Sequence, residues 1–259
     1  MTTLLTAAAA AIAVLAAARS TWSPCGLSML ATVTPLAERA RGHRYRTTAA
    51  WFIAGGVAGG ATLGLAMAGL AEAVGAAGPP VLTVAALAAA ASILAAASDA
   101  PRVRFHLPVH HRQVNERWLD QFRPWVYGAG FGWQIGTGLV TYIKTAALYL
   151  MIVLAALTTS PAVALAIGVL FGLVRGLAVL LGRSITSAAA LAAFHRRFTG
   201  LGPVVLGIVV AGELASALAI VAFVSLWAAL ALVLVLGGTT GATAAAGRVR
   251  RRSPVPART

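Results

Sequence analysis

The first long apolar run of the chain is interrupted at Trp22-Ser23-Pro24-Cys25-Gly26-Leu27-Ser28-Met29-Leu30. The interruption contains Cys25, the only cysteine of the chain, with Pro24 before it and Gly26 after it. Proline and glycine leave backbone groups without helical hydrogen bonds, and at membrane depth this is tolerated only where protein or water satisfies them. We therefore expect a broken first helix whose break forms part of a functional site.

The composition predicts a multi-pass protein of the cell membrane, with the lipid bilayer as its main partner. Hydrophobic residues make up 59% of the 259 residues and charged residues only 10%, which is far from the balance of a soluble domain. The net charge of +14 comes from arginines and one lysine. Because these cations lie between the apolar runs, as cytoplasmic loops require, we do not expect a nucleic-acid partner.

The expected fold is all-α with six transmembrane spans. The apolar runs that define the spans cover residues 4–36, 48–71, 81–97, 125–157, 162–181 and 203–236. The first, fourth and sixth are longer than a straight crossing needs, so they must tilt, break or protrude.

The two halves of the chain align with each other. When the sequence is shifted along a second copy of itself, Trp22 aligns with Trp133. One further residue of shift aligns Gly56, Gly60 and Gly64 with Gly168, Gly172 and Gly176. Each half contains a broken helix, a glycine-rich helix and a plainer third helix. Three crossings per half reverse the orientation of the second half, so the pattern predicts an inverted repeat.

The charges of the loops give an independent prediction of topology. The loop after the first span holds Arg39, Arg41, Arg44 and Arg46, whereas its counterpart, residues 158–161, holds no basic residue. Of the loops between the second and third spans and between the fifth and sixth spans, it is the later one that holds the basic residues. We therefore expect a first repeat (1–98), a cytoplasmic basic linker (99–123), a second repeat (124–238) and a disordered arginine-rich tail (239–259), with both chain ends outside. The arginines of the tail contradict that last placement.

These features resemble the CcdA/DsbD family of transmembrane thiol-disulfide carriers. The resemblance is carried by Trp22-Ser23-Pro24-Cys25, more weakly by Gly130-Phe131-Gly132-Trp133, and by the general plan of the spans. That family passes reducing equivalents from cytoplasmic thioredoxin to thioredoxin-like acceptors outside, using one cysteine in the broken helix of each repeat. The resemblance implies that Cys25 is the catalytic residue, and it implies no cofactor.

The resemblance also identifies the residues that shape the site. Around Cys25 they are Ser23, Pro24 and Gly26, and in the second repeat they are Gln134, Gly136 and Thr137. The second cysteine of the family would fall at Gly136, so a two-cysteine cycle is impossible here. A redox-active Cys25 would need a thiol on a thioredoxin-like protein or a small thiol, together with a helix N-terminus or a cation such as Arg19. The alternative is that Cys25 fills space as a small apolar residue.

A second hypothesis keeps this architecture and changes the cargo to a small solute or a metal ion. The plan also resembles LysE-type exporters, in which broken helices form a polar site at mid-membrane. The polar side chains available for such a site are Ser23, Thr32, Thr34, Gln134, Thr137, Thr141, Lys144 and Thr145. Helical spacing would put the last four on one face, although each threonine could instead bond its own helix.

Three ionisable residues lie within apolar runs, namely Lys144, Arg175 and Glu213. Such charges are costly in a membrane unless they are paired. We expect Glu213 to pair with Lys144 or Arg175.

The linker contains His106, His110 and His111, which could suggest a metal site. Neighbouring arginines disfavour a metal site, so we expect no metal there. We predict instead a surface helix with Val114, Trp118 and Phe122 on one face, and residues 184–198 would form a similar segment.

The sequence has no phosphate-binding loop, nucleophile elbow, acidic dyad or zinc spacing. Any enzymatic activity would therefore be limited to thiol-disulfide exchange.

Overall fold

The computed structural model describes residues 1–101, 103, 107 and 121–225, and these residues form helices and loops without strands. In chain order the helices are α1 (Thr2–Ser20), α2 (Pro24–Thr32), α3 (Pro35–Ala40), α4 (Tyr45–Ala77), α5 (Val81–Asp99), α7 (Pro124–Thr137), α8 (Ala147–Leu157), α9 (Pro161–Leu177), the 3₁₀ helix η1 (Ala178–Ser184) and α10 (Ala188–Val224). The expected all-α fold is confirmed for this part of the chain.

Five helical segments in the described part are long and apolar enough to cross a membrane. They are α1, α4, α5, α9 together with η1, and α10. Helix α4 has 33 residues and is therefore about 50 Å long, which exceeds the hydrocarbon thickness of roughly 30 Å. These helices identify the chain as a membrane protein, as the composition predicted. The fourth expected span consists of two shorter helices, α7 and α8.

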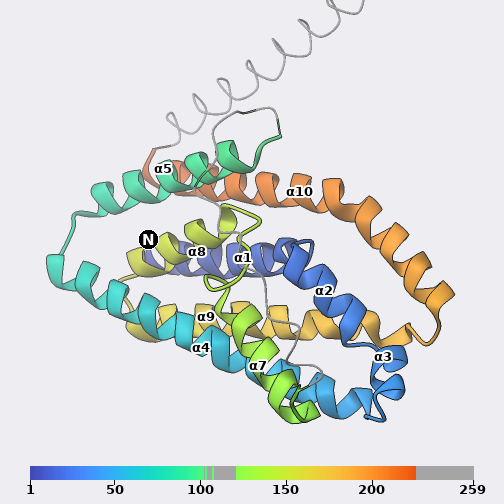
Figure 1. Cartoon of the computed structure of the whole chain (residues 1–259). Helices are drawn as coiled ribbons and strands as arrows, with labels where there is room; N and C mark the ends of the chain where they lie inside the picture. The colour runs from blue at the N-terminus through green and yellow to red at the C-terminus, as the bar shows by residue number, and fades with distance from the viewer. Residues whose placement is uncertain (102, 104–106, 108–120, 226–259) are drawn as a thin grey trace, which may run out of the picture.

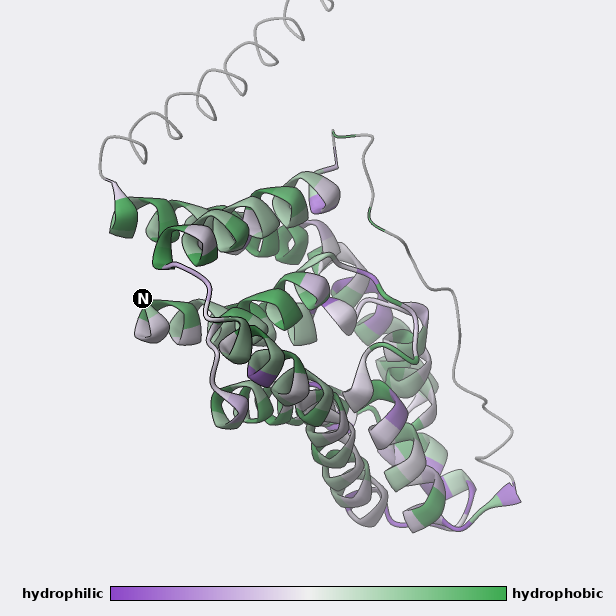
Figure 2. Ribbon diagram, turned by 90° about the vertical axis from the view of Figure 1, so that its left-hand side faces the viewer, coloured by the Kyte–Doolittle hydropathy of each residue, from purple (hydrophilic) through white to green (hydrophobic). Residues whose placement is uncertain are grey.

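The helices form three layers (Figure 1). Helices α5 and α10 lie side by side in one layer, α1 and α8 form the middle, and α4, α7 and α9 form the third. The main apolar core lies between them and includes Leu5, Ile12, Met67, Met151 and Phe171. Figure 2 shows hydrophobic residues along most of the helices.

Glycines hold α4 against both α7 and α9 at backbone distance. On one face of α4, a Cβ atom placed on Gly59 would lie 2.2 Å from the carbonyl oxygen of Trp133 in α7. On the next face, a Cβ on Gly60 would lie 2.4 Å from the carbonyl oxygen of Gly168 in α9. Small residues permit such approach between helices in lipid, where apolar burial gives little driving force.

The segment after η1 differs from the expectation. Residues 184–198 were expected to form a separate surface helix, but α10 begins at Ala188 and continues past Pro203 to Val224. Ser187 caps its first turn by accepting from the backbone N–H of Ala190. The indole of Trp22 stacks on Phe198 with ring centroids 4.1 Å apart. These contacts hold the first turns of α10 against the protein.

Candidate functional sites at the two helix breaks

The predicted break of the first helix is confirmed and lies between α1 and α2. Ser23 is the N-cap of α2, and its side chain accepts from the backbone N–H of Gly26 at 3.2 Å. Pro24 occupies the first helical position, where its missing N–H costs nothing. A Cβ on Gly26 would lie 2.2 Å from the carbonyl oxygen of Thr21, so only glycine fits there. Cys25 is therefore fixed in the first turn of a capped half-helix.

The Cys25 side chain is buried, with 3% of the residue exposed, and its charged neighbour is Arg175 of α9. Arg175 interacts electrostatically with Cys25 and is 2% exposed. Its Nε donates to the carbonyl oxygen of Ile135 in α7 at 3.3 Å, while its Nη1 has no hydrogen-bond partner among the described residues. Arg175 thus connects the Cys25 turn with the end of α7. Arg19, which was expected as a candidate cation near Cys25, interacts electrostatically with Asp99.

Gly136 lies where the resemblance would put a second cysteine, and the structure leaves no room for one. A Cβ on Gly136 would lie 2.2 Å from the carbonyl oxygen of Gly56 in α4. A side chain there would force α4 and α7 apart. The position at which the resemblance would put a second cysteine is therefore a point of close contact between α7 and α4.

The second break lies between α7 and α8, and it is wider than the sequence indicated. Helix α7 ends at Thr137, and Gly138 follows with φ of +70°, a conformation that favours glycine. Helix α8 begins at Ala147. The prediction that Thr137, Thr141, Lys144 and Thr145 share one helical face is therefore wrong, since the last three lie in the intervening loop.

Asp99, at the end of α5, caps α8 across the layers. Its carboxylate accepts from the Thr145 hydroxyl and from the backbone N–H of Ala146, the latter at 2.8 Å. A carboxylate at a helix N-terminus satisfies the unpaired N–H groups and the helix dipole together. The contact anchors the second break to the third helix of the first half.

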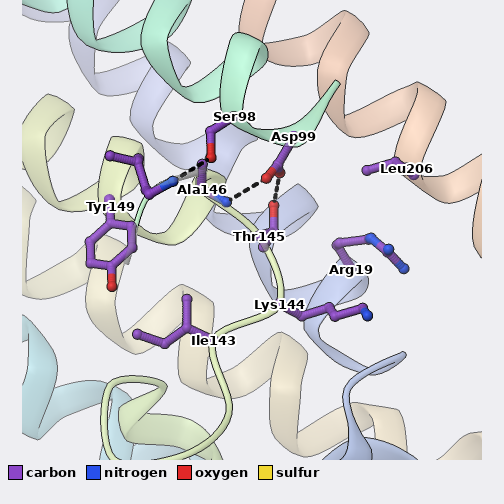
Figure 3. Close-up of a pocket in the computed structure, with 10 residues that line it drawn as sticks. Arg19, Ser98, Asp99, Ile143, Lys144, Thr145, Ala146, Tyr149 and Leu206 are labelled. Carbon is purple, nitrogen blue, oxygen red and sulfur yellow. Dashed lines mark hydrogen bonds between the residues drawn. The ribbon is translucent and has the colours of Figure 1, made fainter. Parts of the chain in front are cut away.

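A cavity of about 190 Å³ opens beside this cap (Figure 3). Its walls come from α1, α5, α8, α10, the loop before α8 and one described residue of the linker. The residues are Arg19, Ser98, Asp99, Leu107, Ile143, Lys144, Thr145, Ala146, Tyr149 and Leu206. Two of the residues expected to line a polar cavity, Lys144 and Thr145, do so.

The other residues expected at that cavity have different positions. The Thr34 side chain caps α3, Thr141 donates to Gly138 in its own loop, and Thr137 donates to Trp133 in its own helix. Arg175 lies beside Cys25 instead. Gln134 is half-buried in α7. The structure therefore divides the predicted polar set between two separate places.

Glu213 of α10 does not form the expected ion pair with Lys144 or Arg175. It is fully buried, and neither carboxylate oxygen has a hydrogen-bond partner in the described part of the chain. It interacts electrostatically with Asp99, which has the same sign of charge. The prediction is wrong because Arg175 is turned toward α7 and Lys144 toward the cavity.

Sequence reasoning missed a buried polar network around Glu38 of α3. The Glu38 carboxylate is fully buried and accepts from the hydroxyls of Tyr127, at 2.7 and 2.9 Å, and of Thr48. Arg41 completes it with an ion pair of 3.0 Å. The sequence places Glu38 in a short loop rich in arginine, which is typical of a solvated acid. Arg41 and Thr48 follow Glu38 closely in the sequence, but Tyr127 becomes its neighbour only through the contact of α7 with α4.

Among the described residues, no group of three or more His, Cys, Asp or Glu side chains could hold a metal ion. The three linker histidines, with Val114 and Trp118, lie outside the described residues, as do most of the linker and all of the tail.

Comparison with known proteins gives one kind of match. The chain is similar to MauF. It is 32% identical over 167 residues to the methylamine utilization protein MauF of Paracoccus versutus, covering 62% of this chain and 59% of the relative. The MauF protein of Paracoccus denitrificans is 32% identical over 175 residues, covering 62% and 58%. The chain thus spans about three fifths of the length of these curated relatives. No protein-family model and no solved structure matches it.

Proposed function

We propose that this chain carries out thiol-disulfide exchange in the cell membrane through Cys25, like the CcdA/DsbD carriers that it resembles. The observation that carries the proposal is the buried Arg175 beside the cysteine at the start of a capped half-helix. A neighbouring cation and a position in the first turn of a capped helix are features found at reactive cysteines. Neither feature would be needed for a cysteine that only fills space.

The exchange uses one thiol on this chain and three sulfur atoms on its partners, two from an external disulfide and one from a second external thiol. The Cys25 sulfur displaces one sulfur of an external disulfide, so that a mixed disulfide forms and a thiolate leaves. An external thiolate then attacks the partner sulfur of that mixed disulfide, which regenerates Cys25 and forms a new external disulfide. Thioredoxin-like proteins are the partners that the resemblance implies. Because Cys25 is buried, the α1–α2 break must open for each step.

The proposed architecture is six spans in two inverted repeats, with α7 and α8 together as the fourth crossing. Three contacts between α4 and α9 support it, namely Gly56 with Gly176, Gly60 with Gly172, and Gly64 with Gly168. In the alignment of the two halves, Gly56 corresponds to Gly168, Gly60 to Gly172 and Gly64 to Gly176. When each glycine is replaced by its counterpart, the contact of Gly56 with Gly176 becomes that of Gly168 with Gly64. The contact of Gly60 with Gly172 stays the same. A two-fold axis through the centre of the crossing would produce this pattern.

The relatives extend the proposal to a biological process. They are named as methylamine utilization proteins, and we assign this chain a role in the same process or in a related amine-using system. A thiol carrier would serve there in the assembly of proteins that contain disulfides.

The decisive experiment is to trap the mixed disulfide. The full chain, in lipid nanodiscs, is incubated with a thioredoxin-like protein that lacks its resolving cysteine and is then analysed on a non-reducing gel. We expect a covalent complex that is absent in Cys25→Ala and forms more slowly in Arg175→Gln. The matched control is Arg46→Gln, which removes the same charge from an exposed position of the same protein. Lack of a complex, together with complete protection of Cys25 from alkylation on both sides of the membrane, would refute the proposal.

A second candidate, transport of a small solute, is favoured by the cavity at the second break. Such half-helix sites near charged residues are where secondary carriers bind their cargo. Full solute flux in Cys25→Ala would support this candidate over thiol exchange, and loss of flux with intact folding would count against it.

A further inference from the structure

The cavity beside α8 is lined by two cations that lack salt bridges within the described part of the chain. Arg19 is 9% exposed, and its Nε has no hydrogen-bond partner there. Lys144 is exposed to the cavity and likewise forms no salt bridge with any described residue. Figure 3 shows the two side chains extending in the same direction, one above the other. In a membrane protein, such cations are costly without a counter-charge.

Asp99, the acid of the cavity, does not supply that counter-charge in full. Its two oxygens accept from Thr145 and from the backbone of Ala146, and its separation from Arg19 exceeds salt-bridge distance. Its charge is thus used mainly at the N-terminus of α8. Among the described residues that line the cavity, two are cations and one is a carboxylate, so this part of the wall carries a net positive charge.

The size and the walls of the cavity restrict the ligand further. A volume of 190 Å³ corresponds to about six water molecules in the liquid and lies below the range of roughly 300–1,000 Å³ for drug-sized ligands. Part of the wall is apolar and is made by Ile143, Leu206 and the ring of Tyr149. A ligand that matches both parts of the wall has one anionic group and a short apolar body.

We infer that this cavity binds small aliphatic monocarboxylates, with Arg19 and Lys144 as the partners of the carboxylate group. A planar guanidinium can donate two parallel hydrogen bonds to a carboxylate, and the ammonium of Lys144 adds a second charge. The apolar body then lies against Ile143 and Leu206. The inference rests on the solute-carrier candidate, but binding is measured without transport.

The test is a titration of the full chain in nanodiscs with sodium butyrate, at constant ionic strength set with sodium chloride. We expect a saturable rise of the melting temperature and saturable heat in calorimetry. Replacing Lys144 by glutamine should weaken butyrate binding roughly tenfold, the value of one charge-assisted hydrogen bond. Lys144→Arg should restore most of the affinity. Arg46→Gln, which removes an equal charge from an exposed site far along the sequence, should leave binding unchanged.

Three outcomes would overturn the inference: no saturable response to butyrate, equal affinity in wild type and Lys144→Gln, or an equal response to sulfate, which would indicate a general anion site. Arg19→Gln is a second variant, and its loss of binding counts only if its helical content is normal. A chain that exchanges thiols or transports another solute but does not bind butyrate would refute this inference alone. A chain that binds butyrate but transports nothing would refute the carrier candidate alone.

Discussion

Replacing Gly60 by alanine tests the close contact between α4 and α9. The added Cβ would lie 2.4 Å from the carbonyl oxygen of Gly168 and 2.7 Å from the Cα of Gly172. Both neighbours are backbone atoms that cannot rotate away. Since atoms in contact normally lie roughly 3.5–4.0 Å apart, the two helices must separate by about 1 Å.

The expected cost follows from two opposing effects. Overpacking a tight interface costs about 1–3 kcal/mol, while replacing glycine by alanine in a helix gains about 1 kcal/mol. Gly69→Ala, in the same helix, is the matched control because no atom lies within 4 Å of its added Cβ. The propensity gain cancels between the two variants. Gly60→Ala should therefore be about 1–3 kcal/mol less stable than Gly69→Ala.

Unfolding by SDS in mixed micelles, followed by circular dichroism, measures this difference for the full chain. We expect Gly69→Ala to equal or exceed the wild type in free energy of unfolding, and Gly60→Ala to fall below Gly69→Ala and to equal or fall below the wild type. If the two alanine variants are equally stable, α4 and α9 are not held at backbone distance. The glycine contacts would then no longer support the proposed two-fold arrangement of the two halves.

Other substitutions test the buried network and the first break in the same assay. Tyr127→Phe should cost about 1.5–3 kcal/mol because it removes a donor from the buried carboxylate of Glu38, whereas Tyr45→Phe, whose hydroxyl donates to a neutral carbonyl, should cost only about 1 kcal/mol. Equal losses would mean that Glu38 does not depend on the phenol. Ser23→Ala should cost about 1 kcal/mol through loss of the N-cap, and Ser23→Thr should retain most of the stability. An unchanged Ser23→Ala would show that the cap is replaced by solvent.

The sequence predicted those features that depend on local chemistry. Ser23, Pro24 and Gly26 favour a helix break through their own backbone chemistry, so the α1–α2 turn could be located from the sequence. The glycines that the sequence aligned between the two halves are the residues at which α4 meets α9. Both predictions needed only the spacing of residues along one helix.

The remaining features depend on partners that are distant in the chain. Residues 138–146 read as part of an apolar helix, but α7 ends before Gly138, which has a positive φ, and Asp99, 47 residues before Ala146, holds the start of α8. Arg175 could have paired with Glu213 by charge alone, but the contact of α9 with α7 turns it toward Ile135. Neither outcome is encoded in local periodicity.

The bond between Glu38 and Tyr127 joins residues that are 89 positions apart, and this separation has a consequence for biosynthesis. At roughly 5–20 residues per second, the ribosome adds Tyr127 about 4–18 s after Glu38. During that interval the carboxylate has Thr48 and Arg41 as partners but lacks the two bonds from the phenol. An arrested or truncated chain would expose this acid, and membrane quality-control proteases would have a chemical mark by which to distinguish an unfinished chain from a completed one.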